Sequence, residues 1–220
     1  MTIPIFPGGL VNSASLIRAA AASICHDSRQ LLTRDEPDYD LKMTEEFARG
    51  YMSFKYAVAH ALHPHKICEI GVGSGISALA FLAARPNAAY LGIDDGSMRG
   101  TASHKPLVER AMLVLPQQCA NELHWMLNNS QHLNEVPGAT YDLVHIDGSH
   151  LRAHTEHDVR LAWRAIAPGG YILVDDARDT AVAAGVFDAF DSFLPGSLDW
   201  AYFEDTTTGN LLIHQGKSRP

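Results

Sequence analysis

The 220-residue sequence predicts an α/β protein whose doubly wound, Rossmann-like sheet has seven strands, mostly parallel, and ends in an antiparallel hairpin. Two observations support this fold class. From Lys66 onward, strand-like and helix-like stretches alternate along the chain, which is typical of a parallel sheet with helices on its faces. The strand-like runs LVHI and YILV are apolar throughout, as expected of strands covered on both sides.

Residues 1–65 are expected to form a helical extension or lid ahead of this sheet. The stretch Ser13–Leu32 has apolar residues along one side, and the polar segment Thr33–Asp40 with Pro37 interrupts it. A second helix is predicted to begin directly after Thr44, which would be its N-cap, and to end at His63-Pro64. Its apolar positions step by three or four residues and so form one stripe: Phe47, Tyr51, Phe54, Val58 and Leu62.

Residues 66–216 are expected to form the main domain, with 217–220 as a tail. The predicted strands are Lys66–Gly71, Ala89–Asp94, Leu123–Leu127, Tyr141–Asp147, Tyr171–Asp175, Asp199–Glu204 and Leu211–His214. The predicted helices between them are Ile76–Ala84, Pro106–Leu115, Leu151–Ile166 and Thr180–Phe193. The short link Asp205–Asn210 contains Gly209-Asn210, which favours a hairpin of the last two strands.

Composition excludes several classes of protein. Hydrophobic residues make up 46% and charged residues 19%, a globular balance that excludes disorder, collagen and coiled coil. The formal charge of −8 argues against nucleic-acid or anionic-membrane partners. There is no apolar run of about 20 residues for a membrane span and no signal-peptide pattern. The three cysteines form no CxxC pair, so we expect a cytoplasmic protein with reduced thiols. The sequence leaves open whether the protein forms a homo-oligomer.

A glycine-rich loop joins the first predicted strand of this domain to the helix that follows. It reads Glu69-Ile70-Gly71-Val72-Gly73-Ser74-Gly75, and glycines there let backbone pass close to a ligand at a helix N-terminus. Asp94 ends the next strand, nineteen residues after Gly75, where a carboxylate can accept both hydroxyls of a ribose. The alternative is a tight turn between strand and helix without a ligand.

Four motifs in order resemble class I S-adenosylmethionine-dependent methyltransferases: CEIGVGSG, LGIDD, YDLVHIDGSH and PGGYILVDD. The resemblance covers about Lys66–His214 and is strongest to metal-dependent small-molecule O-methyltransferases of the macrolide-sugar type, more distantly to the catechol type. It implies that the cofactor S-adenosylmethionine is held at the following residues: Glu69, Gly71, Gly73 and Gly75 around the methionine end, Asp94 at the ribose, Asn129 and Ser130 at the adenine, and Asp147 beside them.

Three carboxylates are expected to gather at one edge of the sheet. Asp147 follows one strand, and Asp175 and Asp176 follow the next, so all three emerge at the carboxyl edge, where ligands bind. An all-oxygen set suits Mg²⁺ or another hard divalent cation, which would relieve the repulsion among the acids. The alternative is that Asp147 and Asp176 cap the two following helices. The resemblance to metal-dependent O-methyltransferases favours the metal.

His150 is the candidate catalytic residue. It lies three residues after Asp147, and the resemblance to the sugar-modifying enzymes implies a general base there. Imidazole suits this role because its ordinary pKa lies near neutrality. The alternative is a histidine that is hydrogen-bonded near the helix start. The polar residues His154, His157 and Asp158 are interpreted as a solvated helix face.

The leading hypothesis is therefore an S-adenosylmethionine- and Mg²⁺-dependent O-methyltransferase that acts on a hydroxyl of a small molecule, such as a natural-product sugar or phenol. Three alternatives stay open. They are a metal-independent N- or carboxyl-methyltransferase, a cofactor-binding protein without catalysis, and a nicotinamide dehydrogenase, which the GxGxG spacing disfavours.

Overall fold

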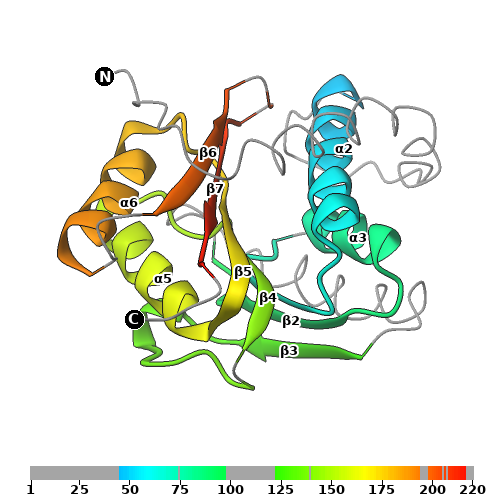
Figure 1. Ribbon diagram of the computed structural model, residues 1–220, viewed down its shortest axis with the longest axis horizontal. Coiled ribbons are helices and arrows are strands. Elements are labelled where there is room, and N and C mark those ends of the chain that lie inside the picture. Colours follow the sequence, from blue (N-terminus) through cyan, green and yellow to red (C-terminus); the bar gives the residue numbers. More distant parts are fainter. Residues whose placement is uncertain are drawn as a thin grey trace.

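The computed structural model describes residues 45–73, 75–97, 122–138, 140–193, 198–204, 206 and 208–216. The predicted helices Ser13–Leu32 and Pro106–Leu115 lie outside these ranges. In the described part, one sheet lies between two layers of helices (Figure 1). Its strands are β1 (Lys66–Ile70), β2 (Ala89–Asp94), β3 (Leu123–Leu127), β4 (Tyr141–Ile146), β5 (Ile166–Val174), β6 (Asp199–Phe203) and β7 (Asn210–His214).

The seven strands lie in the order β3-β2-β1-β4-β5-β7-β6. Strands β1 to β5 pair in parallel, whereas β7 is antiparallel to both β5 and β6. The predicted mixed sheet with a C-terminal antiparallel hairpin is thus confirmed. The carboxyl ends of β1, β2, β4 and β5 meet at one edge, because parallel strands point the same way.

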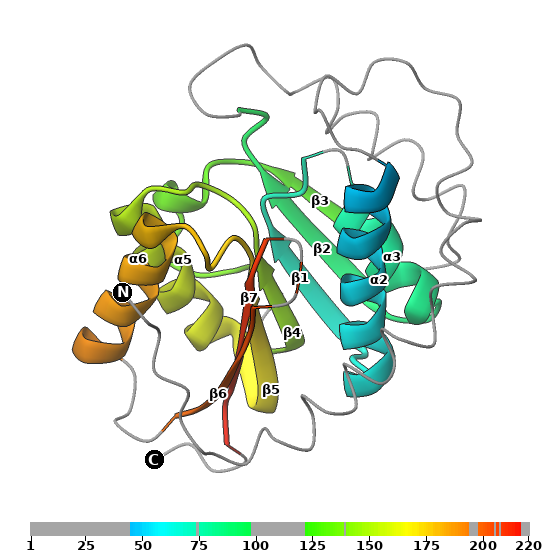
Figure 2. The same cartoon turned by 90° about the horizontal axis from the view of Figure 1, so that it is seen from above.

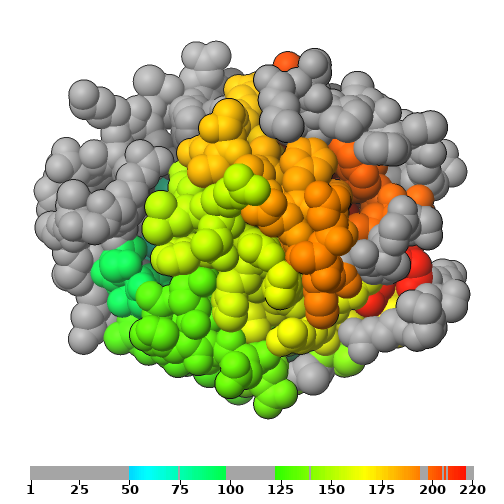
Figure 3. Space-filling view, turned by 90° about the vertical axis from the view of Figure 1, so that its left-hand side faces the viewer, coloured from blue at the N-terminus to red at the C-terminus, as the bar shows by residue number. Residues whose placement is uncertain are grey.

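Helices cover both faces of the sheet. Viewed from above, α2 (Glu45–Leu62) and α3 (Ile76–Ala84) lie on one side, and α5 (Arg152–Ala165) and α6 (Thr180–Ser192) lie on the other (Figure 2). On the outer surface α5 and α6 run side by side (Figure 3). They approach closely at Gly185, where a Cβ atom would overlap the carbonyl oxygen of Arg152. Among the described residues, no helix is both long and apolar enough to cross a bilayer.

Two rows of residues cross the sheet and face opposite layers of helices. The register aligns Cys68, Val144, Ile172 and Ile213 in one row, and all four are fully buried. The next row, which faces the opposite way because strand side chains alternate, contains Glu69, His145, Leu173 and Leu212. This second row is equally buried, so the layer under α2 and α3 includes ionisable side chains.

The start of β5 differs from the prediction. We expected the strand to begin at Tyr171 and the preceding helix to end at Ile166, but β5 begins at Ile166, directly after α5. Ile166 already pairs with Tyr141, and the register then shifts before Leu143. Gly170 permits this irregular stretch, since a Cβ atom there would lie 3.0 Å from the carbonyl oxygen of Asp142. The other predicted element ends within the described residues differ by one or two residues at most.

Candidate active site at the carboxyl edge of the sheet

The glycine loop is packed directly against the end of β4. Gly71 has a φ of +89°, and its N–H donates to the carbonyl of Ile93 at 2.8 Å. A Cβ atom at Gly71 would overlap the carbonyl oxygen of Asp147. Glycine is therefore required here by both the backbone angle and the close approach, and the loop is fixed beside the first residue of the acidic edge.

Asp94, at the end of the neighbouring strand β2, accepts hydrogen bonds from the backbone of the glycine loop. Its Oδ2 accepts hydrogen bonds from the N–H groups of Val72 at 2.8 Å and Gly73 at 2.9 Å, and its Oδ1 accepts from Gly96 at 2.6 Å. The carboxylate thus fixes the backbone of the loop in the position where the sequence predicts the cofactor. Contact between Asp94 and a ribose stays a prediction.

Glu69 lies beneath the loop rather than on its surface. The side chain is fully buried, and its carboxylate accepts hydrogen bonds from the hydroxyls of Ser77 on α3 and Tyr90 on β2. His145 Nδ1 lies 2.9 Å from the same carboxylate. Burial, followed by the nearby Lys55, lowers the pKa of His145, which favours a neutral ring. Glu69, on β1, therefore links α3 to β2 and β4 through its side-chain contacts. Its contact with the cofactor stays a prediction.

Asn129 and Ser130 lie where β2 and β3 end. The Asn129 side chain accepts from the N–H of Gln131 at 2.9 Å, which caps the short 3₁₀ helix η2 (Ser130–His132), and donates to Asp95 Oδ2 at 3.0 Å. The carbonyl of Ser130 lies 3.1 Å from His157 Nε2. These contacts connect the two strand ends next to the glycine loop. The predicted adenine contact stays a prediction.

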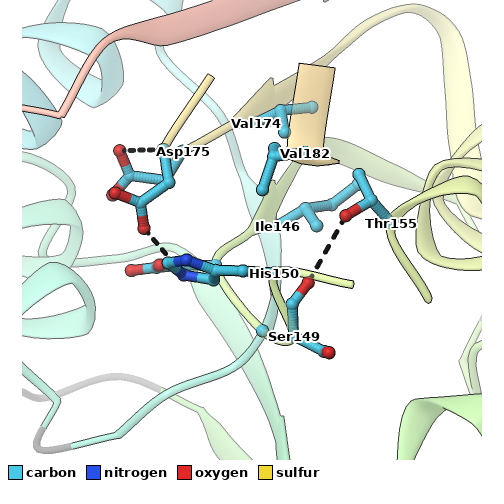
Figure 4. A pocket seen from close by; sticks show the side chains of 10 residues that line it. Ile146, Ser149, His150, Thr155, Val174, Asp175 and Val182 are labelled. Atoms are coloured by element: carbon cyan, nitrogen blue, oxygen red, sulfur yellow. Dashed lines mark hydrogen bonds and ion pairs between the residues drawn. The ribbon is translucent and has the colours of Figure 1, made fainter. Parts of the chain in front are cut away.

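Asp147, His150 and Asp176 form a group that we call the outer group. One ligand atom from each residue lies within 4.8 Å of the others. His150 Nε2 is 2.9 Å from Asp176 Oδ2, and Nδ1 is 3.7 Å from Asp179 Oδ2. Figure 4 shows His150 in a pocket, together with the apolar residues Ile146, Val174 and Val182 that also line it.

The backbone of Asp176 is strained, with a φ of +50°. A non-glycine residue in the left-handed region costs free energy, and such residues are concentrated at functional sites. The strain accompanies the turn after β5 that leaves the Asp176 carboxylate next to His150. This observation agrees with the functional role that the sequence predicts for the residue.

Asp147 also belongs to a second, inner group with His145 and Asp175, whose ligand atoms again lie within 4.8 Å of one another. Asp175 Oδ1 accepts from the Thr208 hydroxyl and from the N–H of Asp176 at 2.9 Å. Asp175 Oδ2 forms an ion pair with Lys55 at 3.0 Å. The three predicted metal ligands therefore lie at one edge but do not form a single group, because Asp175 belongs to the inner group, Asp176 to the outer group, and Asp147 to both. Their binding of one cation stays a prediction.

The pKa values of Asp147 and Asp175 are shifted in opposite directions. Burial raises the pKa of Asp147, and the neighbouring Asp175 raises it further. Burial also acts to raise the pKa of Asp175, but the ammonium of Lys55 outweighs it and holds this pKa at about 2. Tyr51 donates its hydroxyl hydrogen to Asp147 Oδ2 at 2.5 Å. Asp175 is thus the ionised member of the pair, and Asp147 takes up a proton more readily.

The alternative role of helix capping is not supported. The N-cap of α5 is Leu151, which makes no side-chain cap. The N-cap of α6 is Asp179, whose side chain accepts from the N–H of Ala181 at 2.8 Å. Neither Asp147 nor Asp176 caps the helix that follows it.

Lys55 is the site residue that the sequence reasoning missed. It lies four residues after Tyr51 and three before Val58, inside the apolar stripe of α2. A charged residue in the middle of such a stripe is a signal of a buried ion pair, and this signal was present in the sequence. Its partner, Asp175, is 120 positions further along the chain, so the pairing itself required the fold.

Asp158 corrects the interpretation of α5. We expected a solvated face that includes His154, His157 and Asp158, and the two histidines are half-buried, but Asp158 is only 1% exposed. It accepts from Gln131 Nε2 at 3.0 Å, and burial raises its pKa to about 7 despite this bond. The sequence analysis placed Asp158 on the solvated face because its neighbours on the helix, such as Glu156 and Arg160, are charged.

Replacing Asp158 with asparagine should increase stability at pH 8 and have little effect at pH 4. The folded-state pKa of Asp158, about 7, exceeds the ordinary value of about 4, so the wild type loses stability as pH rises between these values. We expect the gain at pH 8 to exceed about 1 kcal/mol. Urea denaturation at both pH values measures it, with Asp191→Asn at an exposed acid of α6 as control. An equal gain at both pH values would contradict the buried-acid explanation.

The strand order, the antiparallel β7 and the glycine loop between β1 and α3 together define the class I methyltransferase fold. Residues 68–177, half of the chain, match the sequence family described as methyltransferase domain. The chain belongs to this family, and it is an S-adenosylmethionine-dependent methyltransferase.

Solved structures agree with this fold. A methyltransferase from Podospora anserina with bound S-adenosylhomocysteine is 17% identical, with a TM-score of 0.60 over 99% of this chain and 100% of the other. The O-methyltransferase TomG from Streptomyces achromogenes, involved in tomaymycin synthesis, is 18% identical, with a TM-score of 0.55 over 97% and 92%. A methyltransferase from Geobacter sulfurreducens is 14% identical, with a TM-score of 0.54 over 90% and 89%. No curated protein sequence matches the chain significantly.

Proposed function

We propose that the protein transfers a methyl group from S-adenosylmethionine to a hydroxyl of a small molecule, a natural-product sugar or a phenol, and that it requires Mg²⁺ or a similar divalent cation. The observation that supports this most is the outer group, in which one carboxylate oxygen each of Asp147 and Asp176 and a ring nitrogen of His150 lie within 4.8 Å of one another. The two carboxylates could hold a cation and leave His150 to act as a base, and the backbone of Asp147 is packed against Gly71 of the glycine loop. Similarity to the O-methyltransferase TomG supports the oxygen acceptor.

The residues present fit a hard divalent cation. Carboxylate oxygens of Asp147 and Asp176 are the ligands that such a cation prefers. The carboxylate of Asp175, the third predicted ligand, is paired with Lys55. When bound, the cation supplies positive charge that lowers the pKa of an acceptor hydroxyl, and S-adenosylmethionine supplies the methyl group.

His150 is proposed as the general base. A ring nitrogen of His150 would take the proton from the acceptor hydroxyl, and the carboxylates of Asp176 and Asp179 on either side of the ring would stabilise the resulting imidazolium. The glycine loop would position the methyl donor, held rigid by the bonds from Val72 and Gly73 to Asp94. Alignment of this kind supplies a large part of the acceleration in bimolecular group transfer.

A second candidate is methyl transfer without a metal, to nitrogen or to a carboxylate. The ion pair between Lys55 and Asp175 favours it, because one of the three acids already has a cation as its partner. Under this proposal, the acidic edge would be structural, and S-adenosylmethionine would be the only cofactor.

Removing divalent cations separates the two candidates. The protein, dialysed against EDTA, would be assayed for S-adenosylhomocysteine release with a panel of catechols and glycosides, and we expect turnover to be lost and then restored by Mg²⁺. The isosteric variant Asp147→Asn should show little Mg²⁺ stimulation but still bind S-adenosylhomocysteine, whereas Asp191→Asn should behave as wild type. Turnover that is the same in EDTA and in Mg²⁺ would reject the metal-dependent proposal.

A further inference from the structure

Lys55 is a lysine with no exposed surface. Its side chain and that of Asp175 are 0% and 1% exposed, and Nζ lies 3.0 Å from Asp175 Oδ2. Nζ also donates to Asn210 Oδ1 at 2.7 Å and lies 4.8 Å from the centre of the Tyr51 ring. A buried ammonium is strongly unfavourable unless it is paired and hydrogen-bonded, so these contacts are what allow a positive charge at this position.

The inner and outer groups differ in their relation to this charge. The inner group contains Asp175, which is the direct partner of Lys55. The outer group contains Asp147, His150 and Asp176. None of these residues forms an ion pair with Lys55 among the described contacts, although the Lys55 charge also acts to lower the pKa of Asp147. A divalent cation ligated by Asp175 would lie close to the ammonium and be repelled by it, whereas a cation in the outer group would be further from it.

We propose that Lys55 acts as the built-in counter-ion of Asp175, and that it thereby directs a divalent cation to the outer group and limits the affinity of the site for that cation. Lys55 is in this sense a positioning residue for the metal. The inference deepens the proposed function, since it concerns the same acidic edge, but it is tested by metal binding and stability rather than by turnover.

The substitution Lys55→Met in the full-length chain tests the inference, because methionine fills a similar volume without the charge. Mn²⁺ serves as the probe, titrated by calorimetry and by electron paramagnetic resonance. We expect the dissociation constant for Mn²⁺ to fall at least tenfold, because Asp175 becomes available as a further carboxylate ligand. We also expect the variant to melt at a lower temperature than the wild type in EDTA, and Mn²⁺ to raise its melting temperature more than that of the wild type.

Two control variants separate charge from packing. Lys66→Met removes an exposed lysine at the start of β1 and should leave Mn²⁺ binding unchanged. The double variant Lys55→Met/Asp175→Asn removes both buried charges and should return Mn²⁺ affinity and metal-independent melting to wild-type levels, since a buried ion pair can be replaced with little loss of stability.

The inference is overturned if folded Lys55→Met binds Mn²⁺ no more tightly than the wild type. If Lys55→Met does not fold even with Mn²⁺, the inference is tested by comparing Asp175→Asn with Asp176→Asn. We expect Asp175→Asn to change the dissociation constant for Mn²⁺ less than threefold and Asp176→Asn to raise it at least tenfold. If both variants lose Mn²⁺ affinity to the same extent, the inference is overturned. Failure of the proposed function has a different signature, namely wild-type turnover that is insensitive to EDTA.

Discussion

Substituting His150 with alanine is expected to lower kcat by about 10²–10⁴-fold, the usual contribution of a positioned general base. The ring is 27% exposed and lies between two carboxylates, Asp176 and Asp179, where the positive charge gained on protonation would be stabilised. The measurement is kcat with an acceptor identified in the panel assay, together with the binding of S-adenosylhomocysteine by calorimetry.

Cofactor binding should be nearly unchanged in His150→Ala, because no contact between His150 and the cofactor is predicted. His124→Ala is the matched control, since His124 is exposed on the edge strand β3 and is paired with the exposed Glu122. A kcat for His150→Ala within threefold of the wild type would exclude the general-base role and favour a purely structural histidine.

The substitution Gly71→Ala should abolish cofactor binding and lower the free energy of unfolding by more than about 2 kcal/mol. A methyl group would overlap the carbonyl oxygen of Asp147, and a φ of +89° is unfavourable for alanine. Either the loop or the end of β4 must move, so the cofactor site and the acidic edge would be disturbed together. Urea denaturation and calorimetry with S-adenosylhomocysteine measure the two effects.

Gly73→Ala provides the matched control for stability. Gly73 also has a positive φ, +52°, but a Cβ atom there would meet no atom of the described residues within 4 Å. Only the backbone cost of about 1–2 kcal/mol is expected. If the two alanine variants lose stability equally, the close packing of the loop against β4 is not the reason that Gly71 is a glycine.

Much of this fold could be predicted because local pattern and global topology agree. The bounds of β2, β3 and α3 follow from apolar runs and from the glycine loop. The placement of Asp147, Asp175 and Asp176 at one edge follows from a general property of parallel sheets, in which the ends of neighbouring strands lie together. Their division into an inner and an outer group does not follow from that property. These predictions required no knowledge of which side chains touch.

The contacts within the site were harder to predict, because they depend on residues far apart in the sequence. Nothing local to Lys55 identifies Asp175 and Asn210 as its partners, and nothing local to Asp158 indicates that Gln131 and η2 cover it. The start of β5 was missed for a related reason. Proline and two glycines usually mark a turn, but pairing of Ile166 with Tyr141 extends the strand through them.

The bond between Lys55 and Asn210 joins residues that are 155 positions apart, and this has a consequence for biosynthesis. A ribosome that has completed the first six strands has not yet supplied the amide oxygen that accepts a hydrogen bond from the lysine. Contacts of such long sequence separation form late and slow the folding of a chain. The hydrogen bond to Lys55 can form only after residue 210 has been synthesised, and a nascent chain that stops earlier would leave the buried ammonium without this acceptor.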